Sequence, residues 1–241
     1  MKIHFRPLPG LSIACAILFA LLLGLGAWQI QRLHWKLALI AMIDRGMRAK
    51  PVELDDGGFP IIEPETDYMH VTVKGRFDNG RETYLFAPSR DGDPGYHVLT
   101  PLIAPGGHVF LVDRGFVPGE KLAPATRRAG LVTGDVRVTG IWRWPSGRGL
   151  FTPNADAAHR IWYWHDLAGM EAIDHMKFSE PGILEADAAP NPGGWPRGGQ
   201  TVVDLPNNHL SYALTWFGLA GGLLGVYLAF HISKGRLRFG P

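Results

Sequence analysis

Two long apolar runs, one near each end, dominate the hydropathy pattern of the chain. The first, Leu11 to Ile30, and the second, Leu205 to Ser233, contain no Asp, Glu, Lys or Arg. A helix of about 20 apolar residues crosses a bilayer, so both runs predict transmembrane helices. The first run could instead be a cleaved secretory signal with a small-residue site at Gly24 to Gly26. Its length and the aromatic and basic residues after it favour a retained anchor.

Between the runs, apolar and polar residues alternate, which is typical of half-buried strands. The first helix is expected to continue towards Pro51, a natural stop, and residues 51–67 to form a loop. Gly106-Gly107 predicts a hairpin turn, Asp166 an N-cap of a short helix through Met176, and residues 188–200 an irregular segment. The predicted strands are Met69–Phe77, Glu82–Phe86, His97–Ile103, His108–Val112, Asp135–Trp142, Ile161–Trp164 and Gly182–Leu184.

The residues Arg114 to Pro118 follow an apolar strand and predict its end and a turn. The alternative is that Arg114 is buried where the domain meets the membrane, and the sequence does not decide whether its role is functional or structural.

Basic residues near the runs predict the orientation in the membrane. Lys234, Arg236 and Arg238 follow the second run, and Lys2 and Arg6 precede the first. By the positive-inside rule both termini lie in the cytoplasm. The predicted fold class is an α+β membrane protein, in which two transmembrane helices flank a mostly antiparallel β periplasmic domain with short helices. Its strands can roll into an open barrel. The predicted boundaries are 1–10 cytoplasmic, 11–30 helix, 31–204 periplasmic domain, 205–232 helix and 233–241 basic cytoplasmic tail.

Composition excludes several classes of protein. A net charge of +2 with no Lys/Arg run does not suit a nucleic-acid binder. Cys15, the single cysteine, lies in an apolar run, so there is no intrachain disulfide and no Cys-x-x-Cys metal or redox motif. Signatures of hydrolases, zinc proteases and nucleotide-binding enzymes are absent, and His159, His165 and His175 are spaced too loosely for a ligand set. We therefore expect a protein that is not an enzyme.

The most distinctive side chains lie where the second run begins. His209, Tyr212 and Trp216 share one helical face. On the first helix, Trp28 and Arg32 form a stripe with Trp35. These residues are either interfacial anchors or a haem site, with His209 as axial ligand to the iron, Tyr212, Trp216 and Trp28 as walls, and Arg32 paired with a propionate.

Two further features of the second run carry predictions. Gly218, Gly221, Gly222 and Gly225 predict a face on which another helix can pack closely. His231 lies at the opposite boundary from His209, about 33 Å along the helix, and is expected to be an anchor.

Five segments, taken in order, resemble the Surfeit locus protein 1 family of assembly factors for haem–copper cytochrome oxidase. They are Leu25 to Lys36 (LGAWQIQRLHWK), Gly75 to Phe77 (GRF), Gly95 to Leu102 (GYHVLTPL), Val112 to Pro118 (VDRGFVP) and Asn207 to Phe217 (NNHLSYALTWF). Phe116 stands where the family usually has tryptophan.

This resemblance implies a role in preparing oxidase subunit I. His209 corresponds to the histidine that the family associates with haem. The expected cofactor is haem a, received transiently from haem a synthase, and the expected partners are subunit I and the lipid bilayer, without nucleic acid. Only ten residues precede the first run, which favours a bacterial inner-membrane protein over a mitochondrial one.

Three alternatives remain at this point. The first is a cofactor-free scaffold that holds a subunit I intermediate through its domain and the glycine face. The second is a sensor, which the short tail after Ser233 disfavours. The third is a copper chaperone, which the lack of a thiolate or thioether cluster disfavours.

Overall fold

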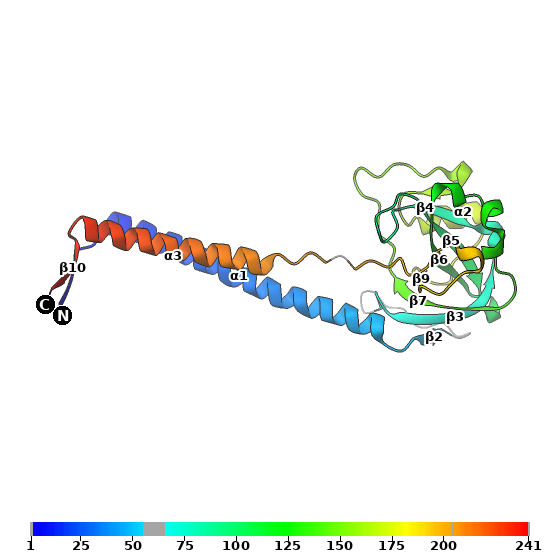
Figure 1. Cartoon of the computed structure of the whole chain (residues 1–241), viewed down its shortest axis with the longest axis horizontal. Helices are drawn as coiled ribbons and strands as arrows, with labels where there is room; N and C mark the ends of the chain where they lie inside the picture. Colours follow the sequence, from blue (N-terminus) through cyan, green and yellow to red (C-terminus); the bar gives the residue numbers. More distant parts are fainter. Residues whose placement is uncertain (1, 55–65, 204, 241) are drawn as a thin grey trace. The chain divides into compact units, whose positions relative to one another are not determined.

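The computed structural model describes residues 2–54, 66–203 and 205–240 and divides into two compact units (Figure 1). The first unit comprises residues 1–42 and 204–241, and the second comprises residues 43–203. In chain order the elements are β1 (Lys2–Phe5), α1 (Pro9–Arg48), β2 (Val52–Leu54), β3 (His70–Phe77), β4 (Thr83–Phe86), β5 (Tyr96–Ile103), β6 (Val109–Val117), β7 (Val136–Arg143), β8 (Ile161–Trp162), α2 (Leu167–Asp174), β9 (Ile183–Ala186), α3 (His209–Ser233) and β10 (Leu237–Gly240).

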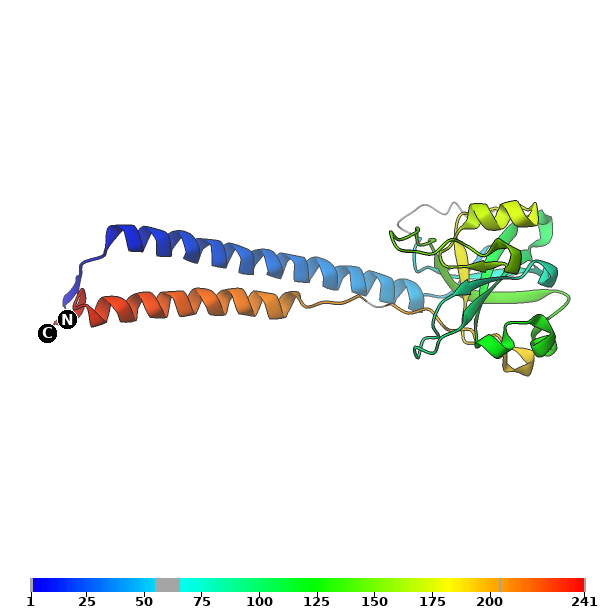
Figure 2. The same ribbon diagram turned by 90° about the horizontal axis from the view of Figure 1, so that it is seen from above.

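The helices α1 and α3 form most of the first unit. Both are long and apolar enough to cross a membrane, and they run antiparallel, side by side (Figure 2). Before the start of α1 and after the end of α3, β1 and β10 pair in an antiparallel ribbon with the register His4↔Arg238 and Phe5↔Leu237. The predicted continuation of the first helix is confirmed, because α1 ends at Arg48, just before Pro51.

The second unit is built on one eight-stranded sheet with the order β2-β3-β7-β9-β6-β5-β4-β8. β3 also pairs with β5 at Arg76↔Ile103 and Phe77↔Leu102, so the pairings of β3, β7, β9, β6 and β5 close a ring. β2/β3, β4/β8 and β6/β9 are parallel, and the other pairings are antiparallel. The prediction of a β-rich, mostly antiparallel domain is confirmed, and the sheet curls as far as this closure.

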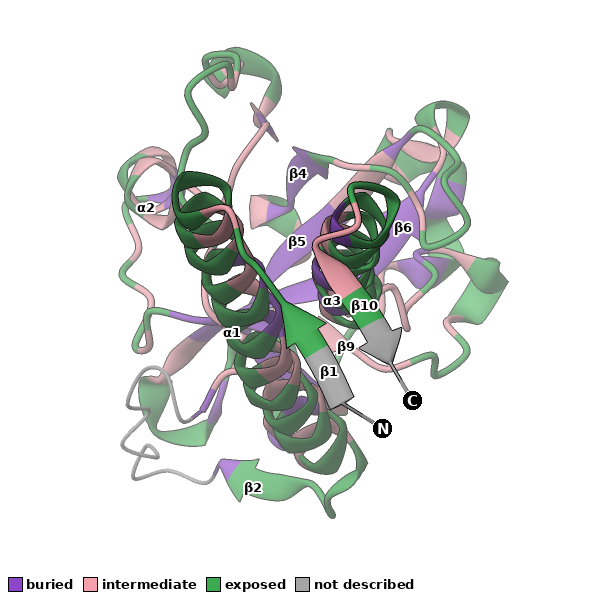
Figure 3. Cartoon of the chain, turned by 90° about the vertical axis from the view of Figure 1, so that its left-hand side faces the viewer, coloured by how far each residue is buried: buried purple, intermediate pink, exposed green. Residues whose placement is uncertain are grey.

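Strands β5 and β6 are buried on both faces, in contrast to the exposed helices (Figure 3). Successive residues of β6 point in opposite directions, as in any strand. Phe110 and Val112 belong to one core with Trp142, and Leu111 belongs to another with Trp162 and Met170 of α2. Strand β9 lies in the interior of the sheet order and pairs on both edges. It lies between β6 and β7, which precede it in the chain.

The structure corrects several local predictions. β6 does not end before Arg114 but continues to Val117. Gly115 makes this possible with a φ of +112°, where a Cβ would lie 1.9 Å from the carbonyl oxygen of Arg197. β8 stops at Trp162 instead of Trp164, and the short helix stops at Asp174 instead of Met176. The start of the predicted loop forms β2, and its residues 55–65 lie outside the described part.

Candidate functional site

Small and polar residues bring α1 and α3 together. Ala213 and Ala220, seven residues apart on α3, are buried, as are Gly26 and Gln29 on α1. Helices without a hydrophobic driving force between them pack through such small residues. The ring of Phe217 occupies the space beside Gly26, where a Cβ would lie 2.5 Å from the ring. A larger residue at position 26 would therefore displace this ring.

His209, at the first position of α3, is tied to α1 by a hydrogen bond. Its Nδ1 lies 2.8 Å from Oε1 of Gln29. An amide oxygen can only accept, so Nδ1 carries a proton, and the tautomer with a free lone pair on Nε2 is the neutral form that this contact favours. Histidines that bind metals commonly donate from the second ring nitrogen in this way, which fixes the tautomer and ring orientation. The arrangement thus fits an axial ligand to haem iron through Nε2.

The other predicted site residues surround this pair unequally. Tyr212 and Trp28 are about half exposed, at 55% and 51%, and Trp216 is half-buried. The guanidinium of Arg32 is stacked 4.7 Å from the ring centroid of Trp35, within the predicted stripe of α1. At 100° per residue this stripe lies on a different face from Gly26 and Gln29. Open aromatic surface is therefore available near the histidine, on faces that the helix pair itself leaves uncovered.

The predicted glycine face of α3 lies opposite the face that holds Ala213 and Ala220. A Cβ built on any of these glycines meets nothing within 4 Å, in the part of the chain that the structure describes. The glycines of this face are Gly218, Gly221, Gly222 and Gly225. This face is thus open to a partner.

His231 is not placed as a simple interfacial anchor. Its side chain is fully buried, and its ring lies 4.2 Å from that of Tyr227 and 5.4 Å from that of Phe5, measured between centroids. Its Nδ1 donates to the carbonyl oxygen of Tyr227 at 2.9 Å. The residue packs the end of α3 against β1.

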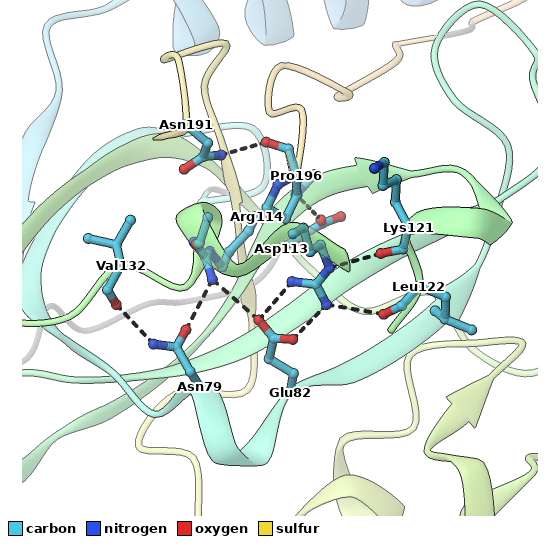
Figure 4. Close-up of polar contacts among 12 residues, drawn as sticks. Asn79, Glu82, Asp113, Arg114, Lys121, Leu122, Val132, Asn191 and Pro196 are labelled. Atoms are coloured by element: carbon cyan, nitrogen blue, oxygen red, sulfur yellow. Dashed lines mark hydrogen bonds and ion pairs between the residues drawn. The ribbon is translucent and has the colours of Figure 1, made fainter. Parts of the chain in front are cut away.

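Arg114 lies inside the second unit, in a buried ionic network (Figure 4). Its Nη1 lies 3.2 Å from Oδ1 of Asn79 and 3.4 Å from Oε1 of Glu82, and its Nη2 donates to the carbonyl of Gly130. Arg127 donates to both oxygens of Glu82, at 3.1 and 2.7 Å. Burial, only partly offset by the charge of Glu82, lowers the pKa of Arg114 to about 10. The geometry assigns Arg114 to the fold.

A second polar cluster lies where β5, β6 and β9 adjoin. Nδ1 of His97 donates to Asp113 at 2.7 Å, and its Nε2 donates to the carbonyl of Pro88 at 3.3 Å. Burial lowers the pKa of His97, but the charge and hydrogen bond of Asp113 outweigh it and raise the value to about 9. Burial and the charge of Asp113 raise the pKa of Glu185. The imidazolium thus compensates the buried acidic charge.

Other histidines singled out in the sequence do not converge. His159 bonds to Asp156 on the surface, and His165 lies beside Ser146, with its pKa lowered by burial. Among the described residues, no group of three His, Cys, Asp or Glu side chains is placed to hold a metal ion.

Sequence reasoning missed Gln29, Glu82 and Arg127. Gln29 carries a usable signal, because an uncharged polar residue at the end of an apolar run and beside Trp28 needs a partner inside a membrane. Glu82 and Arg127 carry none, since charged residues in loops and strand ends are usually exposed.

Comparison with known proteins places these observations in a family. The model of the SURF1 family matches residues 16–221, which include Gln29 and His209. Surfeit locus protein 1 of Mus musculus is 37% identical over 211 residues, covering 81% of this chain and 67% of the relative. Surfeit locus protein 1 of Takifugu rubripes is 34% identical over 230 residues, covering 88% of this chain and 92% of the relative. A SURF1-like protein of Drosophila melanogaster is 34% identical over 215 residues, covering 82% of this chain and 69% of the relative. The resemblance seen in the motifs is confirmed, and the chain belongs to the SURF1 family.

Proposed function

We propose that this protein is an assembly factor for haem–copper cytochrome oxidase, which holds haem a and aids its insertion into subunit I. Family membership supports the oxidase role. The hydrogen bond between His209 and Gln29 is the observation that carries the haem site, because it prepares Nε2 as a ligand.

The proposal includes a membrane location. Large apolar side chains on α1 and α3 are exposed, for example Ile17 at 66% and Val226 at 70%. Helices with such a surface need a lipid or protein environment. We place both termini in the cytoplasm and the β-rich unit in the periplasm of a bacterial inner membrane, on the distribution of basic residues.

Each predicted residue has a role in holding haem a. His209 would supply the axial nitrogen, and Gln29 would keep that ring in one tautomer. Tyr212, Trp216 and Trp28 would contact the faces of the macrocycle, and Arg32 would pair with a propionate, which its planar guanidinium suits. Haem a would supply redox chemistry to the oxidase, and this protein would act as its carrier without catalysis. Haem a synthase would be the transient donor.

The visible spectrum of the detergent-purified full chain, coexpressed with the enzymes of haem a synthesis, tests this proposal. We expect a stoichiometric haem a band that His209→Ala abolishes and Gln29→Leu weakens. His34→Ala is the matched control, because His34 is an exposed histidine of the same helix pair. If wild type carries no haem while the pigment is made, or if His209→Ala retains the band, the carrier proposal is wrong.

The second candidate is a cofactor-free scaffold for a subunit I intermediate. The observation that favours it is the open glycine face of α3. Under this alternative, His209→Ala leaves oxidase assembly intact and Gly222→Leu abolishes it. The haem carrier predicts loss of assembly with His209→Ala.

A further inference from the structure

The ribbon of β1 and β10 has one basic face. Residues that lie opposite each other in an antiparallel pair share a face, and alternate residues along each strand share it too. The register His4↔Arg238 therefore places His4 and Arg238 together. Arg6 and Arg236 continue the same alternation, and the backbone N–H of Arg6 donates to the carbonyl of Arg236 at 2.8 Å. We call these four residues the basic face.

The basic face borders an open cavity of about 320 Å³, which is lined by its four residues and Gly235. Nη1 of Arg236 lies 3.4 Å from the carbonyl oxygen of Arg6, and Nε of Arg238 lies 3.0 Å from that of Gly235. These bonds use one nitrogen of each guanidinium and leave other donors of the fork for a ligand. Gly235 has a φ of +63°, and a Cβ there would lie 2.8 Å from Nη2 of Arg238. Gly235 thus adopts the positive φ of the turn at no steric cost and leaves room for the guanidinium of Arg238, which lines the cavity.

Among the described residues of the first unit, no Asp or Glu side chain compensates this charge. Residues 1–42 and 205–241 contain no Asp or Glu in the sequence. Like charges that face each other across two strands are destabilising, so an anion in the cavity would relieve the repulsion. Arginine forks match the oxygens of a phosphate with paired hydrogen bonds.

The apolar residues next to the ribbon indicate which kind of molecule carries the anion. The ring of Phe5 packs against Tyr227 and His231 of α3, which ties the ribbon to the end of the apolar helix pair. Tyr227 also lines an apolar groove of about 260 Å³ between α1 and α3, with Ser12, Cys15, Ala16, Phe19, Leu223 and Leu224. Its hydroxyl lies 2.5 Å from that of Ser12. Phe5 alternates with His4 and Arg6, so it lies on the opposite face of the ribbon from the basic face, and it contacts Tyr227, which lines the apolar groove.

We propose that the basic face binds the phosphate headgroup of an anionic phospholipid, whose acyl chain lies in the apolar groove. Basic clusters directly beyond a transmembrane helix attract such lipids. The inference rests on the membrane location proposed above, and it is independent of haem binding. The bound lipid would contact both the start of α1 and the end of α3 and so hold these two helix ends together.

Native mass spectrometry of the delipidated full chain in detergent, with equal amounts of phosphatidylglycerol and phosphatidylcholine, tests the proposal. We expect wild type to retain phosphatidylglycerol preferentially. The double variant Arg6→Gln/Arg236→Gln should bind it about fivefold more weakly for each arginine removed. Arg76→Gln/Arg137→Gln is the control, because it removes the same charge from exposed positions of the second unit and should leave the preference unchanged.

Two further measurements separate the sources of phosphate. Ala16→Trp fills the apolar groove and should lose the lipid, although the basic face stays intact. Inorganic phosphate at millimolar concentration should not displace phosphatidylglycerol from wild type. Equal retention of the two lipids, an unchanged preference in Arg6→Gln/Arg236→Gln, or displacement by phosphate would overturn the proposal. The haem a band of the same variants is measured as well, so that a failure of the lipid proposal can be told apart from a failure of the carrier proposal.

Discussion

Replacing Glu82 by Gln should be among the most damaging single changes in the second unit. The carboxylate faces two guanidiniums, Arg127 at 3.1 and 2.7 Å and Arg114 at 3.4 Å, and the side chains of all three residues are at most 2% exposed. Glutamine preserves the shape but removes the charge, so both cations stay buried without a counterion. Breaking a buried pair from one side costs about 3–5 kcal/mol. In a domain of this size that corresponds to a fall of roughly 6–20 °C in Tm.

The assay is urea and thermal unfolding of the full chain in detergent, followed by near-UV circular dichroism. Trp142 and Trp162 are at most 3% exposed and report on the packing of the two cores. Asp135→Asn is the matched control, since its ion pair with Arg76 is exposed and should matter little.

A double variant tests the cause of the loss. Arg127→Leu removes one of the stranded cations, so Glu82→Gln/Arg127→Leu should be clearly more stable than the sum of the single effects predicts. The reasoning is refuted if Glu82→Gln costs no more than Asp135→Asn. It is also refuted if the two single effects simply add.

Two further predictions concern the helix pair and the pH dependence of stability. Gly26→Leu should push Phe217 aside and lengthen the distance between spin labels on α1 and α3, whereas Gly24→Leu, which meets open space, should not; equal distances in both variants would contradict the packing described. His97 has a folded pKa of about 9 against about 6.5 unfolded, so its contribution, about 3 kcal/mol, is complete below pH 6.5 and lost as pH rises to 9. Unfolding between pH 6 and 9.5 should show this fall in wild type and a flatter profile in His97→Gln, and equal profiles would rule out the pairing with Asp113.

The sequence pattern of apolar and β-branched residues predicted most strands, including β5 and β6, which are buried on both faces. It failed where tertiary contacts decide the backbone. Gly115 continues β6 through a positive φ that only the neighbouring carbonyl of Arg197 explains. The three residues of β2 are too few to show a period, and they form a strand because β3 offers a free edge.

The candidate haem site was predicted in part. The periodicity of α3 groups His209 with Tyr212 and Trp216, but it cannot say which face of α1 the histidine meets. The stripe of Trp28 and Arg32 was the obvious choice, yet Gln29 makes the contact, because small residues near it let the helices approach. The ionic network of Arg114 depends on a loop arginine and a strand-end glutamate that are 45 residues apart, a separation that no local pattern reveals.

The position of β9 also bears on how the domain folds. β6 and β7 are synthesised before β9, but they become neighbours of it and not of each other. One edge of β6 and one edge of β7 therefore have no partner strand until more than 35 further residues, the stretch between Arg143 and Ile183, have been synthesised. Unpaired edges invite pairing with other chains, and pairings so distant in sequence form slowly. We therefore expect the pairing of β9 to complete the sheet late in folding, and a chain interrupted before β9 to expose two strand edges that can pair with other chains.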